Sequence, residues 1–255
     1  DHFEPYLMHA VKRIPNLETA GIRKFFNGPE SFTPDTNYLL GETPEIKNFF
    51  VCCGFNSIGI VSAGGAGKVT AEWMINGEVN EDVFSLDITR FEKFHSETNF
   101  IIDRAAESLG NQYAMHWPYK QQKTSRNIKT FPYHDLLKKE GACFGQVAGF
   151  ESPLWYAIDG EKPEFKYSFG YQNWYKSAQN ETINTRKNVG FFELTPFAKF
   201  EIEGEAAYSS LQYLCSNDIK NNDGAITYTQ MLNSKGGIEA DLSVTCISKN
   251  KFRII

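Results

Sequence analysis

The chain has 255 residues and a formal net charge of −5, from 26 Lys and Arg residues against 31 Asp and Glu residues. This acidic balance gives no electrostatic footprint for nucleic acid, and the longest apolar stretches fall far short of the roughly 20 residues that cross a bilayer. We therefore expect no nucleic-acid partner and no membrane span, in a chain long enough for one large domain or two small ones.

Two further features of the composition bound the class of protein. The chain begins at Asp1 without an initiator Met, so we expect a fragment of a longer polypeptide. Its cysteines are odd in number and mostly embedded in apolar runs, which predicts reduced core residues rather than a disulfide framework. The two adjacent cysteines do not have the spacing of metal ligands, so no metal site is predicted. These cysteines are Cys52, Cys53, Cys143, Cys215 and Cys246.

The first ordered pattern is "NYLLGETPEIKNFFVCCGF", which predicts a strand, a polar turn and a buried strand from Phe49 to Cys53. A glycine-rich turn follows, and we predict a helix from about Gly67 to Asn76. A phosphate loop does not fit, because Ser62 and Val69 stand where that motif needs Gly and Ser or Thr. The glycines predict either the close approach of a flat ligand or tight turns with close helix packing.

Later segments change in texture. Residues 97–112 look helical, residues 113–133 look extended and polar, and "HDLLKKEGACFG" predicts a short amphipathic helix closed by Gly141. Further on, "EAAYSSLQYLCSN" predicts a helix, and "GAITYTQMLNSKGGIEADLSVTCI" predicts a β-hairpin with Gly236 and Gly237 at its turn. Together these segments predict a multi-domain α+β chain.

The predicted hairpin gathers polar side chains on one face. Counting back from the turn pairs Gln230 with Asp241 and places Tyr228 on the same face. An acidic residue on such a face is ordinarily solvated surface. The opposite face carries a predicted core stripe of Ile238, Ala240, Leu242 and Val244.

Several other polar residues have two interpretations. Asp35 in "NGPESFTPD" is expected to cap a proline-bounded turn. Three separated histidines lack a nearby nucleophile and are expected to be structural: His95, His116 and His134. Three arginines could bind a substrate carboxylate, although salt bridges are the commoner role in an acidic chain: Arg104, Arg126 and Arg186.

Three segments in order resemble the dimethylglycine and sarcosine dehydrogenase family. The stretch from "NGPESFTPDTNYLLGE" to "FSLDITRF" resembles the C-terminal end of the FAD-binding α/β oxidoreductase domain, and "RAAESLGNQYAMHWP" with "FGQVAGFESPLWY" resembles the small bridging central domain. "RKNVGFFELTPFAKFEIEG" with "YTQMLNSKGGIEADLSV" resembles the start of the folate-binding domain, which is similar to the glycine-cleavage T-protein, an aminomethyltransferase. The resemblance implies domain limits of 1–88, 89–150 and 151–255.

The resemblance also implies site residues. The turn before the predicted helix would lie along the pyrimidine edge of the FAD isoalloxazine ring, with the helix N-terminus aimed at N1 and the C2 carbonyl. Asp241 would contact the reactive nitrogens of tetrahydrofolate as a catalytic residue, and Tyr228 would lie beside the pterin. Ala240 departs from T-proteins, which often carry two successive acids here. The implied flavin residues are Gly54, Phe55, Asn56, Ser57, Ile58, Gly59, Ile60 and Val61.

The activity implied by the resemblance is oxidation of dimethylglycine or sarcosine to an iminium, with transfer of the one-carbon unit to tetrahydrofolate. The electron acceptor, an electron-transfer flavoprotein or oxygen, stays open. The implied location is the cytoplasm of a bacterium or the mitochondrial matrix of a eukaryote. Two alternatives remain: a non-catalytic homologue such as the regulatory subunit of pyruvate dehydrogenase phosphatase, and a folate-dependent aminomethyltransferase with a vestigial flavin domain.

Overall fold

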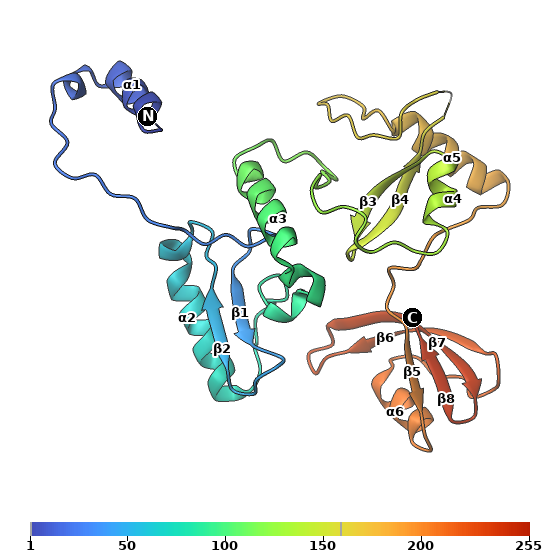
Figure 1. Cartoon of the computed structure of the whole chain (residues 1–255). Coiled ribbons are helices and arrows are strands. Elements are labelled where there is room, and N and C mark those ends of the chain that lie inside the picture. The colour runs from blue at the N-terminus through green and yellow to red at the C-terminus, as the bar shows by residue number, and fades with distance from the viewer. Residues whose placement is uncertain (1, 159) are drawn as a thin grey trace. The chain divides into compact units, whose positions relative to one another are not determined.

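The computed structural model describes residues 2–158 and 160–255 (Figure 1). The chain divides into two compact units, and the boundary lies between Ala114 and Met115. Both units mix helices with antiparallel strands, so the α+β prediction is confirmed. No helix among the described residues is both long and apolar enough to span a bilayer.

The elements of the first unit include three short 3₁₀ helices, η1 to η3. In chain order they are α1 (Glu4–Arg13), η1 (Pro15–Glu18), β1 (Leu39–Glu42), β2 (Phe50–Cys53), α2 (Gly59–Asn76), η2 (Ile88–Arg90), η3 (Lys93–Ser96) and α3 (Thr98–Asn111).

The second unit begins with a helix and a hairpin and ends in a larger sheet. Its elements are α4 (His134–Lys139), β3 (Ala142–Val147), β4 (Phe150–Tyr156), α5 (Tyr175–Lys187), β5 (Phe200–Glu203), α6 (Ala207–Leu214), β6 (Ile226–Leu232), β7 (Ile238–Ser248) and β8 (Lys251–Ile254).

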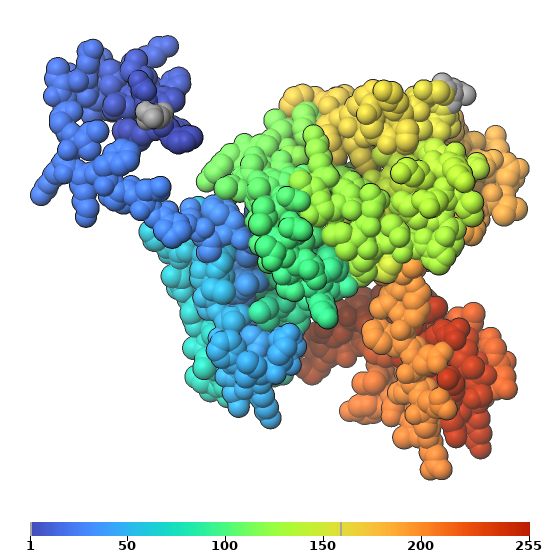
Figure 2. All heavy atoms as spheres, in the orientation of Figure 1, coloured from blue at the N-terminus to red at the C-terminus, as the bar shows by residue number. Residues whose placement is uncertain are grey.

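In the first unit, β1 and β2 form an antiparallel ribbon that packs against α2. Leu40 is buried in β1 and also forms an isolated parallel bridge with Asp87. The outer side of α2 is open in the space-filling view (Figure 2). The partly or fully buried residues of α2 recur at helical spacing and are Gly59, Ser62, Ala66, Val69, Thr70, Glu72 and Trp73.

Gly41 in β1 is required by the packing of α2 on the ribbon. Its φ is +113°, a conformation that L side chains rarely adopt, and a Cβ atom built there would lie 2.7 Å from the indole ring of Trp73. The backbone of β1 therefore approaches the helix more closely than any other residue type would allow.

The start of α2 differs from the sequence prediction. The helix begins at Gly59, not near Gly67, and runs on through Gly64, Gly65 and Gly67 to Asn76. Glycine inside a helix costs up to about 1 kcal/mol relative to alanine, which is why the sequence favoured a later start. Packing of the buried stripe against the ribbon overrides this local preference.

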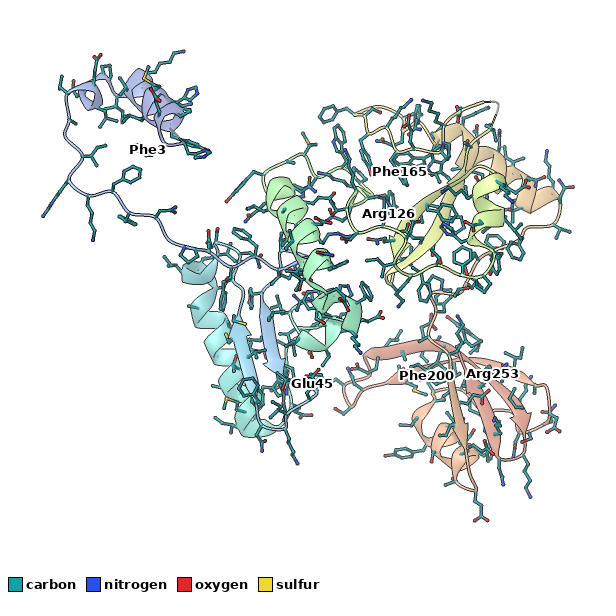
Figure 3. The ribbon with its side chains drawn as sticks, in the orientation of Figure 1. Phe3, Glu45, Arg126, Phe165, Phe200 and Arg253 are labelled. Atoms are coloured by element: carbon teal, nitrogen blue, oxygen red, sulfur yellow. The ribbon has the colours of Figure 1, made fainter. Side chains whose placement is uncertain are left out.

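In the second unit, the β3–β4 hairpin is anchored by an ion pair between Arg126 and Glu151 (Figure 3). Arg126 Nε donates to Glu151 Oε1 at 2.8 Å, and its Nη2 donates to the other carboxylate oxygen. Burial alone would raise the pKa of Glu151, but hydrogen bonds from Arg126 and from the Asn127 amide lower it. Arg126 is thus engaged in a structural ion pair, the commoner of its two predicted roles.

The C-terminal sheet has the antiparallel order β5-β8-β7-β6, and α6 packs on it. At the β6–β7 turn, Asn233 accepts hydrogen bonds from the amides of Lys235 and Gly237, and Gly236 has a φ of +80°, so the predicted hairpin is confirmed. The core between α6 and the sheet consists of Ala207, Leu211, Cys215, Ile219, Leu242, Val244, Cys246 and Phe252.

One residue of the predicted core stripe lies outside the core. Ile238 is 66% exposed and lies at the start of β7, beside the turn. The register of β7 with β6 shifts directly after Ile238, and the part of β7 that faces α6 begins beyond this shift. Ala240 is half-buried, whereas Leu242 and Val244 are buried as predicted.

The cysteine prediction is wrong for two of the five residues. Cys52 and Cys53 are exposed at the end of β2, a strand of a ribbon with only two strands. The other cysteines, Cys143, Cys215 and Cys246, are buried. Burial raises the pKa of the Cys143 thiol to about 11, so this residue stays protonated at neutral pH.

A pair of substitutions tests the C-terminal core. Phe252 is 0% exposed in β8, and Phe200 is 63% exposed in the adjacent strand β5. We expect Phe252→Ala to lower the free energy of unfolding by about 3–5 kcal/mol, and Phe200→Ala by less than about 1 kcal/mol, because only the first leaves a cavity. Urea unfolding of both variants measures the difference, and equal losses would contradict this core.

Candidate functional site

The loop between β2 and α2 has an unusual backbone. Gly54, Asn56 and Ser57 have φ values of 70°, 49° and 68°, so two successive non-glycine residues adopt the left-handed conformation. Such residues are uncommon and require support from their surroundings. The loop turns sharply and leads directly into the first turn of α2.

Support for the loop comes from a buried hydrogen-bonded pair, Thr33 and Asn56. The Thr33 amide donates to Asn56 Oδ1 at 2.8 Å, and Asn56 Nδ2 donates to the Gly54 carbonyl at 2.5 Å and to Thr33 Oγ1 at 3.1 Å. Thr33 is 5% exposed and Asn56 is 1% exposed. The side chain of Asn56 therefore points into the protein and makes its hydrogen bonds there.

Asp35 fixes the segment on the other side of Thr33. Its Oδ1 accepts a hydrogen bond from the Asn37 amide at 3.1 Å, which confirms its predicted role as a turn cap. Arg90 pairs with both carboxylate oxygens, at 2.7 and 3.1 Å, and also donates to the Asn37 carbonyl at 2.8 Å. The Thr-Pro-Asp turn signalled Asp35, whereas nothing in the sequence signalled its partner Arg90.

The N-terminus of α2 is open to solvent. Within the part of the chain that the structure describes, the amides of Gly59, Ile60 and Val61 have no acceptor, as expected for the first turn of a helix. Their N–H groups and the helix dipole favour a ligand edge that carries acceptor atoms or negative charge. The pyrimidine edge of a flavin carries such acceptors, so these residues fit that group.

The predicted flavin residues are contiguous in the structure, but they divide into two sets. Gly54 to Ile58 form the loop, and Gly59 to Val61 form the first turn of the helix. The later glycines face open space, since a Cβ atom built at Gly64, Gly65 or Gly67 would meet nothing within 4 Å. Close packing inside the described structure therefore does not explain these three glycines.

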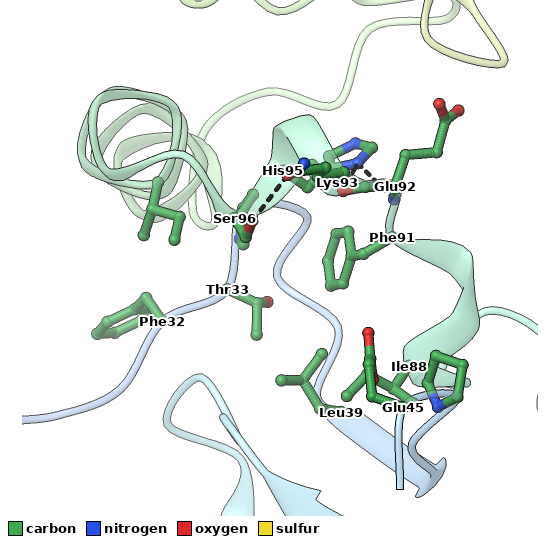
Figure 4. A pocket seen from close by; sticks show the side chains of 13 residues that line it. Phe32, Thr33, Leu39, Glu45, Ile88, Phe91, Glu92, Lys93, His95 and Ser96 are labelled. Atoms are coloured by element: carbon green, nitrogen blue, oxygen red, sulfur yellow. Dashed lines mark hydrogen bonds between the residues drawn. The ribbon is translucent and has the colours of Figure 1, made fainter.

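A cavity of about 660 Å³ adjoins Thr33 in the first unit (Figure 4). His95 in its wall accepts a hydrogen bond from the Glu92 amide at Nδ1, in the structural role predicted for it. Burial lowers the pKa of His95, so the ring is neutral at pH 7. The lining is mainly apolar, with Phe32, Pro34, Leu39, Pro44, Ile88, Phe91 and Ile101.

The second group of predicted site residues lies on the exposed face of the C-terminal sheet. Gln230 is paired with Asp241 and Tyr228 with Ser243, as the sequence predicts. Gln230 Nε2 donates to Asp241 Oδ1 at 3.0 Å. Hydrogen bonding from Tyr228, and then from Gln230, lowers the pKa of Asp241. Asp241 is thus a solvent-facing carboxylate that is ionised at neutral pH and is held between two donors.

Comparison with known families divides the chain into three consecutive parts. Residues 1–73 match the family described as FAD dependent oxidoreductase, residues 76–130 match the FAD dependent oxidoreductase central domain, and residues 133–255 match the GCVT N-terminal domain. The order of these matches is the order that the sequence resemblance implied.

Curated relatives align with the whole chain or nearly so. The chain is 41% identical over 255 residues to 4-methylaminobutanoate oxidase (formaldehyde-forming) of Paenarthrobacter nicotinovorans, covering 100% of this chain and 31% of that protein. It is 37% identical to the mitochondrial pyruvate dehydrogenase phosphatase regulatory subunit of Mus musculus, with coverage of 100% and 30%. It is 33% identical to the mitochondrial sarcosine dehydrogenase of Mus musculus, with coverage of 96% and 29%. The chain thus spans about a third of the length of these relatives.

The hydrogen bonds to Asp241 predict a measurable change in its titration. Because these bonds stabilise the carboxylate, the folded pKa is depressed, and removing a donor lets the group protonate at a higher pH. We expect Tyr228→Phe to raise the pKa of Asp241, and Gln230→Met to raise it by less. NMR titration of the Asp241 carboxyl carbon measures both shifts. Tyr213→Phe, at an exposed tyrosine of α6, is the control. An unchanged pKa of Asp241 in Tyr228→Phe would contradict the hydrogen bond from Tyr228 to Asp241.

Proposed function

The chain belongs to the dimethylglycine and sarcosine dehydrogenase family, whose members are FAD-dependent oxidoreductases with a T-protein-like domain. From this premise we propose an activity for the full-length protein. The protein oxidatively demethylates an N-methylated glycine, dimethylglycine or sarcosine, and passes the one-carbon unit to tetrahydrofolate. The observation that carries the proposal is the open N-terminus of α2 behind the left-handed loop, within the part of the chain that matches the FAD-dependent oxidoreductase.

The residues of the first unit bind and tune the cofactor in this proposal. Bound FAD supplies the chemistry of hydride acceptance from the N-methyl group of the amine. The loop from Gly54 to Ile58 would lie along the pyrimidine edge of the ring, and the amides of Gly59, Ile60 and Val61 would donate hydrogen bonds to that edge. These donors and the helix dipole would favour negative charge there and so raise the reduction potential of the cofactor.

The residues of the second unit handle the folate. Tyr228 lies beside the pterin and Asp241 contacts the reactive nitrogens of tetrahydrofolate. A carboxylate whose pKa is lowered is a weak base, so its main role is to accept a hydrogen bond from folate N–H and to orient that nitrogen toward the iminium carbon. Gln230 donates to the same carboxylate at 3.0 Å and helps to hold it in place for the ligand.

The proposal also covers the remaining features of the protein. The substrate is a small methylated amine and the electron acceptor stays open. The predicted limits at residues 88 and 150 remain predictions, because a family match need not end where a domain ends. Mitochondrial and bacterial relatives support a location in the mitochondrial matrix of a eukaryote or the cytoplasm of a bacterium.

One alternative function has support of its own. The 37% identity to a phosphatase regulatory subunit over the full chain favours a non-catalytic regulatory protein as the second candidate. A third possibility, a folate-dependent aminomethyltransferase with a vestigial flavin domain, would retain the folate site and lack amine oxidation. The two experiments that follow separate these functions.

The first experiment follows flavin reduction in the full-length protein. We expect anaerobic addition of sarcosine or dimethylglycine to bleach the visible absorbance of bound flavin, because hydride transfer from the methyl group reduces the ring. Glycine, which has no methyl group, is the control, and 4-methylaminobutanoate tests a longer methylated amino acid. Bleaching by none of these amines would favour the regulatory function.

The second experiment separates the two half-reactions with Asp241→Asn. Asn retains the shape of the side chain but removes the charge that accepts the hydrogen bond from folate N–H, and loss of such a charged contact to a reacting group costs on the order of 10²-fold in rate. We expect formation of methylenetetrahydrofolate to fall by that factor, with flavin reduction by the amine nearly unchanged and formaldehyde released instead. Glu239→Gln, two residues away on β7, is the matched control. Equal loss of both half-reactions would assign Asp241 to the fold.

A further inference from the structure

Asn56 is the most buried polar residue of the candidate flavin loop. Its side chain contacts only protein: Oδ1 accepts from the Thr33 amide, and Nδ2 donates to the Gly54 carbonyl and to Thr33 Oγ1. Its own amide donates to the Ser31 carbonyl at 3.2 Å. These bonds join the segment around Thr33 to the start and the middle of the loop, and they leave no side-chain atom of Asn56 for a cofactor.

We propose that Asn56 is a positioning residue, which holds the loop from Gly54 to Ile58 in the shape that presents the first amides of α2 to the flavin. The proposal rests on the proposed function and deepens it. Two successive left-handed residues do not persist unless the surroundings determine their conformation. The Asn56 side chain provides that determination, because it bonds the Gly54 carbonyl, two residues back, and the Thr33 backbone, 23 residues back in the chain.

Helix α3 supports the same pair from the region that matches the central domain. Ser108 is buried, and its hydroxyl donates to the Pro34 carbonyl at 2.6 Å, next to Thr33. Gln112, at the end of α3, donates to the Asn56 carbonyl at 3.4 Å. The loop is therefore fixed from three parts of the chain, and we infer that α3 contributes to flavin binding through Asn56 without touching the flavin.

The test compares two glycine substitutions in the full-length protein. Glycine tolerates the positive φ at both positions, so Asn56→Gly and Asn48→Gly remove the same side chain from the same type of backbone conformation. Asn48 is exposed in the turn between β1 and β2, whereas Asn56 has the buried contacts. We expect Asn56→Gly to weaken FAD binding about tenfold or more, since buried polar partners are left unpaired, and we expect Asn48→Gly to change it by less than about threefold.

Amide hydrogen exchange of the cofactor-free protein provides a readout that does not depend on flavin. In Asn56→Gly, we expect exchange about tenfold faster or more, confined to residues 31–37 and 54–58. Asn56→Asp is a second variant for the case in which the glycine variant does not fold. It keeps the size of the side chain but places a carboxylate oxygen against the Gly54 carbonyl, and we expect the same faster exchange in residues 31–37 and 54–58.

The outcomes separate the inference from the proposed function. Unchanged exchange and unchanged FAD binding in Asn56→Gly would overturn the inference, and faster exchange across the whole first unit would overturn it in favour of a general structural role. Failure of the unaltered protein to bind FAD would overturn the proposed function, and the exchange data would then still decide whether Asn56 holds the loop.

Discussion

The buried hydrogen bonds between Thr33 and Asn56 are the constraint on which the candidate flavin site depends. They close the loop after β2 in a conformation that the backbone alone disfavours, and they set the point at which α2 begins. The ion pair of Asp35 with Arg90 and the hydrogen bond from Ser108 to the Pro34 carbonyl hold the residues that follow Thr33. In our proposal, a contact that involves neither ligand nor substrate determines which backbone amides a ligand meets.

The two groups of site residues carry opposite electrostatic character. The start of α2 offers N–H donors and no side-chain charge, which suits a ligand edge that gains electrons. The face of β6 and β7 offers an ionised carboxylate held by Tyr228 and Gln230, which suits a ligand that presents N–H groups and develops positive charge as it reacts. This division matches a reaction in which oxidation and capture of the carbon unit occur in different parts of the protein.

Sequence reasoning succeeded where periodicity is strict and local. The turn at Gly236 has a defined chemistry, so the register of β6 and β7, and with it the pairing of Gln230 with Asp241, followed directly. It failed where tertiary packing overrides propensity, as in α2, whose internal glycines concealed a helix that starts at Gly59. Contacts between residues far apart in the chain, such as Asp35 with Arg90, carry no local signal.

Gly41 and Trp73 impose an order on how this sequence can evolve. A side chain at position 41 would collide with the indole at 2.7 Å, so a change there costs less once Trp73 has been replaced by a smaller residue. The positive φ adds a separate penalty that no change at position 73 relieves, so the new residue stays strained in either background. The effects of changes at the two positions are therefore not additive, and the less costly path changes position 73 before position 41.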